Sequence, residues 1–362
     1  MALPGVYLFS VIAAFLISAI LTAVVKKIAV KLDFVARPRE DRFHKSVIPL
    51  GGGIAIFITI ALFCIAAAIA IITNNVNINE YLSGTRAMKV CQLATILSCA
   101  AVLFALGLWD DIKNLKPSTK LLVQFIAAFC AAYFADVRVE LFIESKIITS
   151  LISSVWIVLL INIFNFLDNM DGASTGIALI ATIILFFTAV MSSQTLVAHF
   201  ALVFAGTLAG FLVFNHFPAS IFMGDAGSLV IGFFVAALTL KTTYYRGGSI
   251  DKWYLVLMPL IIMALPLYDF LTVSFLRLKQ GKSIFVGDTQ HFSHRLKKRG
   301  LTEKQTVWTL YLATLTTGLG AIILKLSRSP FGAILVAVQI IMVLAIIAIL
   351  ESTGTNDPTK QQ

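Results

Sequence analysis

A long apolar run ends in a polar cluster at residues 151–172, which read LISSVWIVLLINIFNFLDNMDG. The cluster holds three amides and two carboxylates: Asn162, Asn165, Asp168, Asn169 and Asp171. An Asp at the centre of a membrane span costs roughly 2.5 to 3.5 kcal/mol, whereas a Leu contributes only about −0.5 kcal/mol. The cluster therefore lies at a membrane edge or lines a protected cavity, and ionisable groups in such places are candidates for function.

The whole chain is far more apolar than a soluble domain. Hydrophobic residues make up 59% of its 362 positions and charged residues only 13%, against about 25% charged residues in soluble proteins. Apolar runs of about 20 residues, the length that crosses a bilayer, recur along the chain. We therefore predict an all-α, polytopic integral membrane protein with about eleven transmembrane helices, near residues 6–25, 51–72, 91–108, 119–136, 147–166, 174–192, 196–215, 227–243, 253–275, 306–324 and 330–350.

Lys and Arg gather in three of the connecting loops, those after the first and third spans and before the tenth. By the positive-inside rule these loops are cytoplasmic, so the N-terminus is expected outside and the C-terminus inside. We expect one transmembrane domain over residues 1–351 and a disordered cytoplasmic tail over residues 352–362. Pro259 and Pro266 lie inside the ninth apolar run and predict a kinked or broken helix there.

Four polar clusters fall on the predicted cytoplasmic face together. They are the pair Asp110 and Asp111 and the segments 168–172, 217–228 and 291–295. Motifs of one active site must share a side of the membrane. Their agreement therefore predicts a single site on the cytoplasmic face.

Asp110 and Asp111 follow the third apolar run, and Lys120 stands at the start of the fourth. Adjacent carboxylates repel each other unless a cation is shared between them. Mg²⁺ is a natural partner, because it takes carboxylate oxygens together with waters and substrate phosphates. Lys120 is then a phosphate ligand. The alternative is a solvated helix end, with Lys120 as an anchor whose charge reaches the membrane surface.

Asn162, Asn165 and Asn169 are spaced to share one stripe of a helix, with Asp168 and Asp171 at its end. Amides and carboxylates together suit a metal ion and the hydroxyls of a sugar or ribose. Hydrogen bonding between helices is the alternative, and it explains one Asn better than it explains five polar residues.

The segment 222–228, Phe-Met-Gly-Asp-Ala-Gly-Ser, leads into the eighth span. Its glycines permit close approach of the backbone to a ligand, and the following helix N-terminus offers free N–H groups to an anion. Asp225 is then either a metal ligand or a helix cap. Phe222 offers a stacking face for a base.

His291, His294 and Arg295 stand in a strongly basic loop. Two nearby His could suggest zinc, but no Cys lies in any loop to complete such a site. His and Arg as donors to phosphate oxygens fit better, and binding of anionic lipid headgroups is the alternative.

The polar inventory as a whole predicts phosphoryl transfer onto an acceptor in the membrane. Carboxylates serve a divalent ion, cations serve phosphates and amides serve hydroxyls, all at one leaflet. Two anionic phosphates must approach each other in such a reaction, and a metal with Lys, Arg and His screens their repulsion. The chain has no Gly-x4-Gly-Lys-Ser/Thr loop, which argues against a P-loop ATPase.

These motifs resemble the polyprenyl-phosphate N-acetylhexosamine-1-phosphate transferase superfamily, glycosyltransferase family 4, over essentially the whole chain. Eleven spans with the N-terminus outside also resemble the undecaprenyl-phosphate GlcNAc-1-phosphate transferase branch, which starts O-antigen, enterobacterial common antigen and teichoic acid linkage units. The motifs that carry the resemblance are the early loop His44–Gly53, Asp110-Asp111, Asn162-x2-Asn165-x2-Asp168-Asn169-x-Asp171-Gly172, Phe222-Met-Gly-Asp225-x-Gly227-Ser228 and His291-x2-His294-Arg295.

The resemblance implies transfer of a sugar-1-phosphate, GlcNAc-1-phosphate first, from a UDP-sugar to undecaprenyl phosphate, with release of UMP. It implies Mg²⁺ as cofactor, with Mn²⁺ as the alternative, and Asp225 and Asp110 as its ligands. The expected partners are UDP-GlcNAc, the undecaprenyl phosphate lipid and the inner, cytoplasmic membrane. No nucleic acid is expected, and a homodimer is left open.

The resemblance also implies roles for the other polar residues. Asp110 or Asp111 would deprotonate the lipid phosphate, or one of them would attack as a nucleophile. The nucleotide would lie beside Phe222, Asp168 and Asp171, and the sugar or pyrophosphate beside the His-Arg loop. The residues expected in catalysis are Asp110, Asp111, Lys120, Asp168, His291, His294 and Arg295, and those expected in substrate binding are His44, Asn162, Asn165, Asn169, Asp171 and Phe222.

Two positions depart from the family pattern. Asn169 stands where many relatives have Gly, and Ala36 replaces an acidic residue two positions before Pro38. The His-x2-His-Arg loop also differs from the triple His of the muramoyl-pentapeptide branch, so the phospho-N-acetylmuramoyl-pentapeptide transferase of peptidoglycan synthesis is the alternative reaction. A secondary transporter would hold its charges at the bilayer midplane instead, and a non-catalytic lipid-binding membrane protein would not need the carboxylates.

Overall fold

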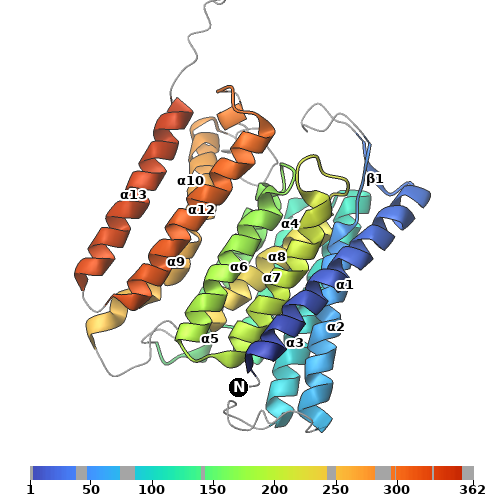
Figure 1. Cartoon of the computed structure of the whole chain (residues 1–362), viewed down its shortest axis with the longest axis horizontal. Helices are drawn as coiled ribbons and strands as arrows, with labels where there is room; N and C mark the ends of the chain where they lie inside the picture. The colour runs from blue at the N-terminus through green and yellow to red at the C-terminus, as the bar shows by residue number, and fades with distance from the viewer. Residues whose placement is uncertain are drawn as a thin grey trace, which may run out of the picture.

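Long helices run up and down the computed structural model in alternating directions (Figure 1). The structure describes residues 3–37, 47–73, 86–139, 143–242, 250–281, 295–297, 299–327 and 330–352. Within these ranges ten helices are long and apolar enough to cross a membrane. They are α1 (Leu3–Lys31), α2 (Gly52–Thr73), α3 (Arg86–Lys113), α4 (Pro117–Phe134), α5 (Lys146–Leu167), α6 (Ala173–Met191), α7 (Thr195–Asn215), α8 (Gly224–Lys241), α12 (Glu303–Leu326) and α13 (Pro330–Ser352).

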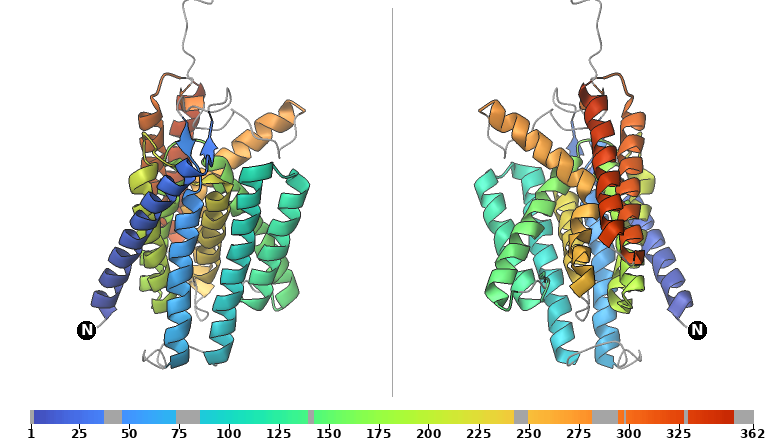
Figure 2. Two further views of the ribbon diagram at one scale, coloured as in Figure 1. Left: turned by 90° about the vertical axis from the view of Figure 1, so that its right-hand side faces the viewer. Right: turned by 90° about the vertical axis from the view of Figure 1, so that its left-hand side faces the viewer.

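The ninth predicted span is broken, as its prolines predict. It consists of the 3₁₀ helix η2 (Ile250–Leu257) and the helices α9 (Met258–Ile262) and α10 (Ala264–Lys279). The two halves meet at Met263 with a bend of 68°, and Figure 2 shows α10 leaning away from the neighbouring helices. Proline lacks the N–H that would continue the helical hydrogen bonds. Counted as one span, this pair brings the total to the predicted eleven within the described ranges.

A short hairpin joins α1 to α2. Its strands are β1 (Val35–Ala36) and β2 (Ile48–Pro49), which pair antiparallel with Val35 opposite Pro49 and Ala36 opposite Ile48. The hairpin stands at the end of the bundle where α1 finishes (Figure 2). Ala36, one of the two departures from the family pattern, is buried in this hairpin.

α8 is the central helix of the bundle. It packs against α2, α3 and α5, and 83% of its apolar span is buried within the protein. Glycines on its neighbours permit this approach. A Cβ added to Gly53 of α2 would lie 2.3 Å from the backbone nitrogen of Gly227, and one added to Gly107 of α3 would lie 2.5 Å from the Cα of Ala226. The start of α8 is therefore held by direct backbone contact with two other helices.

We expect Gly107→Ala to destabilise the protein by about 2 kcal/mol, because the added methyl group overlaps the backbone of α8. The measurement is the midpoint of thermal unfolding of the purified protein in detergent. Gly5→Ala is the matched control, since a Cβ there meets nothing within 4 Å. Equal midpoints for the two variants would contradict the close packing of α3 on α8.

Candidate active site

The polar motifs of the described residues converge at one end of the bundle. α3 and α5 end there, and α4 and α8 begin there (Figure 1). The four helices pack pairwise, α3 with α4 and α8, and α5 with α4 and α8. The structure thus brings Asp110, Asp111, the 168–172 turn and the 222–228 segment to a shared face, as the sequence predicts. Which side of the membrane that face occupies stays a prediction.

Lys120 is the centre of the site. Its ammonium Nζ donates to Oδ2 of Asp110 and to Oδ2 of Asp225, both at 2.6 Å. The three side chains are only 12 to 28% exposed, and they come from α3, α4 and α8. The other carboxylate oxygen of Asp110, Oδ1, accepts a hydrogen bond from the backbone N–H of Leu115 at 2.6 Å. Two carboxylates from different helices therefore aim one oxygen each at the same cationic point.

Asn165 fixes the other oxygen of Asp225. Its Nδ2 donates to Asp225 Oδ1 at 3.0 Å and to Ser228 Oγ at 2.9 Å. Asp225 is the second residue of α8, yet the bonds of its carboxylate go to Lys120 and Asn165. The carboxylate of Asp225 therefore does not cap α8, and its role as a metal ligand stays a prediction.

Asp111 caps the start of α8 instead. Its Oδ1 accepts the N–H of Asp225 at 2.8 Å and its Oδ2 accepts the N–H of Ala226 at 3.2 Å. A carboxylate near a helix N-terminus is stabilised by the helix dipole. Gly224 has φ +72°, and a Cβ there would lie 2.5 Å from Asp111 Oδ2. These two N–H groups, expected from the sequence to serve a bound anion, are thus taken by the protein's own carboxylate.

Asn162 and Gln124 form a second layer below the ion pairs. Asn162 Nδ2 donates to Gln124 Oε1 at 2.8 Å and to the carbonyl of Val158 at 2.8 Å. Gln124 is fully buried and stands one helical turn after Lys120 on α4. Asn162 is therefore engaged between helices, which is the alternative that its sequence position left open.

The turn after α5 departs from one expectation. α5 ends at Leu167 and Asp168 is its C-cap, so Asn169 lies in the turn and not on a helical stripe with Asn162 and Asn165. That part of the prediction was wrong, because the helical spacing was extended past the end of the helix. Asp171 Oδ2 accepts the N–H of Ala219 at 2.8 Å, which ties the turn to the segment before α8.

Three backbone hydrogen bonds hold Phe222 and Met223 to the early loop. Phe222 N–H donates to the carbonyl of Pro49, Gly52 N–H to the carbonyl of Phe222, and Gly53 N–H to the carbonyl of Met223, each at 2.9 Å. Phe222 itself is half-buried. The early loop of the family pattern is thus part of the same assembly as Asp225.

Two buried amides next to the site were not singled out from the sequence. One is Gln124. The other is Asn215, at the end of α7, whose Oδ1 accepts from Thr175 Oγ1 at 3.0 Å and whose Nδ2 donates to the carbonyl of Ile221 at 3.1 Å. Each is a lone amide in a long apolar run. A polar side chain in lipid costs free energy, and that cost is the sequence signal that could have identified each of them.

The predicted His-Arg loop is only partly within the described residues. Arg295 does not join the Lys120 cluster; it pairs with Glu351 near the end of α13. His44, His291 and His294 lie outside the described residues, so their assigned roles stay predictions.

The carboxylates around Lys120 fit a divalent metal ion whose remaining ligands are waters and substrate phosphates. No group of three or more His, Cys, Asp or Glu that could hold a metal by itself occurs in the part of the chain that the structure describes. Mg²⁺ is commonly bound by one or two carboxylates, completed by waters and substrate phosphates. Asp110 and Asp225 would supply those two carboxylates, since each aims one oxygen at the Lys120 ammonium.

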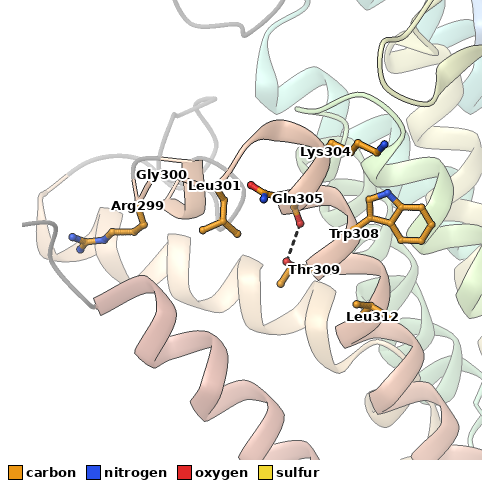
Figure 3. Close-up of a pocket in the computed structure, with 8 residues that line it drawn as sticks. All are labelled: Arg299, Gly300, Leu301, Lys304, Gln305, Trp308, Thr309 and Leu312. Carbon is orange, nitrogen blue, oxygen red and sulfur yellow. Dashed lines mark hydrogen bonds between the residues drawn. The ribbon is translucent and has the colours of Figure 1, made fainter.

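A separate pocket of about 610 Å³ lies along α12 (Figure 3). None of the residues predicted for the site lines it. It connects to the site indirectly. Trp308 packs edge-on against Tyr311 with ring centroids 5.8 Å apart, and the Tyr311 hydroxyl donates to the carbonyl of Gly172 at 2.6 Å. The residues lining the pocket are Arg299, Gly300, Leu301, Lys304, Gln305, Trp308, Thr309 and Leu312.

Comparison with known families finds a similarity over the middle of the chain. A model of glycosyl transferase family 4 matches residues 93–243. The matched segment contains the Lys120 cluster and the 168–172 turn.

Individual relatives extend the match beyond that segment. A probable undecaprenyl-phosphate N-acetylglucosaminyl 1-phosphate transferase of Bacillus subtilis is 29% identical over 95% of this chain and 92% of its own length. The undecaprenyl-phosphate alpha-N-acetylglucosaminyl 1-phosphate transferase of Salmonella typhi is 27% identical over 84% of this chain and 80% of its own. A decaprenyl-phosphate N-acetylglucosaminephosphotransferase of Mycobacterium leprae is 28% identical over 83% and 79%. The predicted resemblance to the polyprenyl-phosphate N-acetylhexosamine-1-phosphate transferase superfamily, and to its GlcNAc-1-phosphate branch, is confirmed.

Proposed function

We propose that the protein transfers GlcNAc-1-phosphate from UDP-GlcNAc to undecaprenyl phosphate and releases UMP. The observation that carries the proposal is the Lys120 ammonium shared between Asp110 and Asp225 at the end of a membrane bundle. The relatives named as N-acetylglucosaminyl 1-phosphate transferases support the same reaction. We place it at the cytoplasmic face of the cytoplasmic membrane, as the first membrane step of cell-envelope glycan synthesis.

The reaction needs two phosphate groups brought together. An oxygen of the lipid phosphate attacks the phosphorus that carries the sugar, and the bond from that phosphorus to the oxygen of UMP breaks. Lys120 binds the phosphate oxygens, and Asp110 takes a proton from the lipid phosphate where one is present. Asp110 and Asp225 would hold Mg²⁺, which would neutralise part of the charge of the crowded phosphates.

The surrounding residues hold the side chains of the site in position. Asn165 orients the Asp225 carboxylate, and Asp111 anchors the start of α8 on which Asp225 stands. We assign the uridine side of the donor to Phe222 and to the turn holding Asp168 and Asp171. The turn and Phe222 are joined through the segment 219–222, because Asp171 binds the N–H of Ala219.

The charge distribution argues against a transporter. The Asp and Lys residues of the site stand at helix ends rather than at mid-span, whereas transporters bind substrate near the bilayer midplane. A non-catalytic lipid-binding protein would have no use for three carboxylates gathered around α8.

The test is exchange of radiolabelled UMP into UDP-GlcNAc by purified protein with undecaprenyl phosphate and Mg²⁺. We expect exchange with UDP-GlcNAc and little with UDP-N-acetylmuramoyl-pentapeptide, and a panel of UDP-sugars ranks the other donors. Exchange only with the muramoyl-pentapeptide donor would favour the peptidoglycan enzyme instead. Absence of exchange with every donor would overturn the proposal.

A further inference from the structure

The end of the last helix holds Arg295 and Arg299. The Glu351 carboxylate accepts from Arg295 Nη2 at 3.1 Å, and its backbone carbonyl accepts from Arg299 Nε at 2.9 Å. In Figure 3 Arg299 points away from Trp308, on the opposite side of the pocket. A second carboxylate, Asp269 of α10, lies 3.9 Å from Arg295 Nη2. Arg295 is thus held between two helices that are far apart in sequence.

The contacts of Arg295 are one-sided. Both carboxylates meet the same nitrogen, Nη2, while Nε and Nη1 are buried and have no hydrogen-bond partner in the described part of the chain. A guanidinium has five N–H donors in a rigid fork, which matches the geometry of a phosphate or carboxylate. Buried donors without a partner call for an explanation, and an anionic ligand supplies one.

Arg295 is one helix away from the carboxylate site. Asp269 is followed by Phe270, whose ring stacks on that of Phe166 with centroids 6.3 Å apart. Phe166 directly follows Asn165, the partner of Asp225. α10, which meets Arg295 through Asp269, therefore also lies against the end of α5 through Phe270.

We propose that Glu351, assisted by Asp269, is a positioning residue for the transferase. It fixes Nη2 of the Arg295 guanidinium so that the remaining N–H donors, on Nε and on Nη1, are held ready to bind phosphate oxygens of a substrate. The identity of that phosphate rests on the proposed function, and it belongs either to the donor pyrophosphate or to the lipid acceptor. The alternative is a purely structural ion pair between α13 and the segment before α12, which would stabilise the fold without affecting substrate binding.

The decisive variant is Glu351→Gln, which keeps the size of the side chain and removes its charge. We expect KM to rise about tenfold for one substrate, with kcat changed less than about twofold, because Arg295 is no longer held in place. A rise in KM for UDP-GlcNAc would show that Arg295 binds the donor phosphate, and a rise in KM for undecaprenyl phosphate would show that it binds the acceptor phosphate. In an Arg295→Ala background the same substitution should add nothing, and Glu351→Asp should recover part of the loss.

Glu303→Gln is the matched control. Glu303 pairs with Lys297, two residues beyond Arg295, so this variant removes an acid from the same segment without touching Arg295. It should leave both KM values unchanged. If Glu351→Gln lowered only the thermal stability, or raised KM equally in the Arg295→Ala background, Glu351 would have a structural role alone.

Calorimetric binding of UDP and of a short-chain polyprenyl phosphate separates this inference from the proposed function. A wild-type protein that transfers no sugar, yet binds one of these ligands about tenfold more tightly than Glu351→Gln, would overturn the function and keep the positioning role. Equal affinities and equal KM values in the two proteins would overturn the positioning role.

Discussion

Asp225→Asn should lower kcat for UMP exchange by about a thousandfold, with the folded protein retained. The substitution preserves the shape of the side chain but removes the charge that faces Lys120 at 2.6 Å. It also removes one of the two carboxylates proposed to hold Mg²⁺. Losing one preorganised electrostatic contact at a reacting centre commonly costs about 10² to 10³ in rate, and the metal contribution adds to this loss.

Asp136→Asn is the matched control for Asp225→Asn. Asp136 is also an ion-paired Asp, with its Oδ1 2.7 Å from Arg138 Nε, but it follows α4 at the opposite end of the bundle. Its φ of +56° is a conformation that Asn tolerates. We expect wild-type exchange from this variant. More than about a tenth of wild-type exchange from Asp225→Asn would contradict the central role of Asp225.

The helices of this protein could be predicted closely because lipid imposes a single rule on every span. A backbone in hydrocarbon must satisfy its hydrogen bonds internally, so each apolar run of sufficient length becomes a helix. Pro259 and Pro266 located the broken span for an equally local reason. The gathering of Asp110, the 168–172 turn and the 222–228 segment at one end follows from counting the spans between them.

The contacts within the site could not be read from the chain, because they depend on how the helices pack. Lys120 reaches Asp225 across 105 positions of sequence, and nothing in the local pattern distinguishes that bond from binding to a substrate phosphate. The same limit applies to Asp111. In the sequence it cannot be distinguished from Asp110. Its role as a helix cap arises from the packing of α3 on α8.

Other differences have local causes. The helical spacing that grouped Asn169 with Asn162 and Asn165 does not show where the helix ends. Gln124 and Asn215 belong to no motif. Only the free-energy cost of an amide inside an apolar run indicates that they have a role.

Lys120→Gln should both slow the reaction and change how the protein responds to Mg²⁺. Without its ammonium, the carboxylates of Asp110 and Asp225 face each other with no cation between them. Removing one partner from a largely buried ion pair destabilises by about 3 to 5 kcal/mol, and partial exposure of this cluster reduces that to about 2 kcal/mol. We expect kcat to fall about a hundredfold through the loss of a phosphate ligand.

The Mg²⁺ response of Lys120→Gln is the more informative measurement, because it reads the two carboxylates without any catalysis. In the wild-type protein the ammonium competes for the oxygens that a metal would take, so millimolar Mg²⁺ should raise the unfolding midpoint only slightly over a chelator. In the variant the same Mg²⁺ should recover most of the lost stability, because the ion replaces the missing cation. Lys116→Gln, an exposed lysine at the start of the same helix, should match wild type with and without metal. An identical Mg²⁺ shift in all three proteins would mean that Asp110 and Asp225 share no divalent cation.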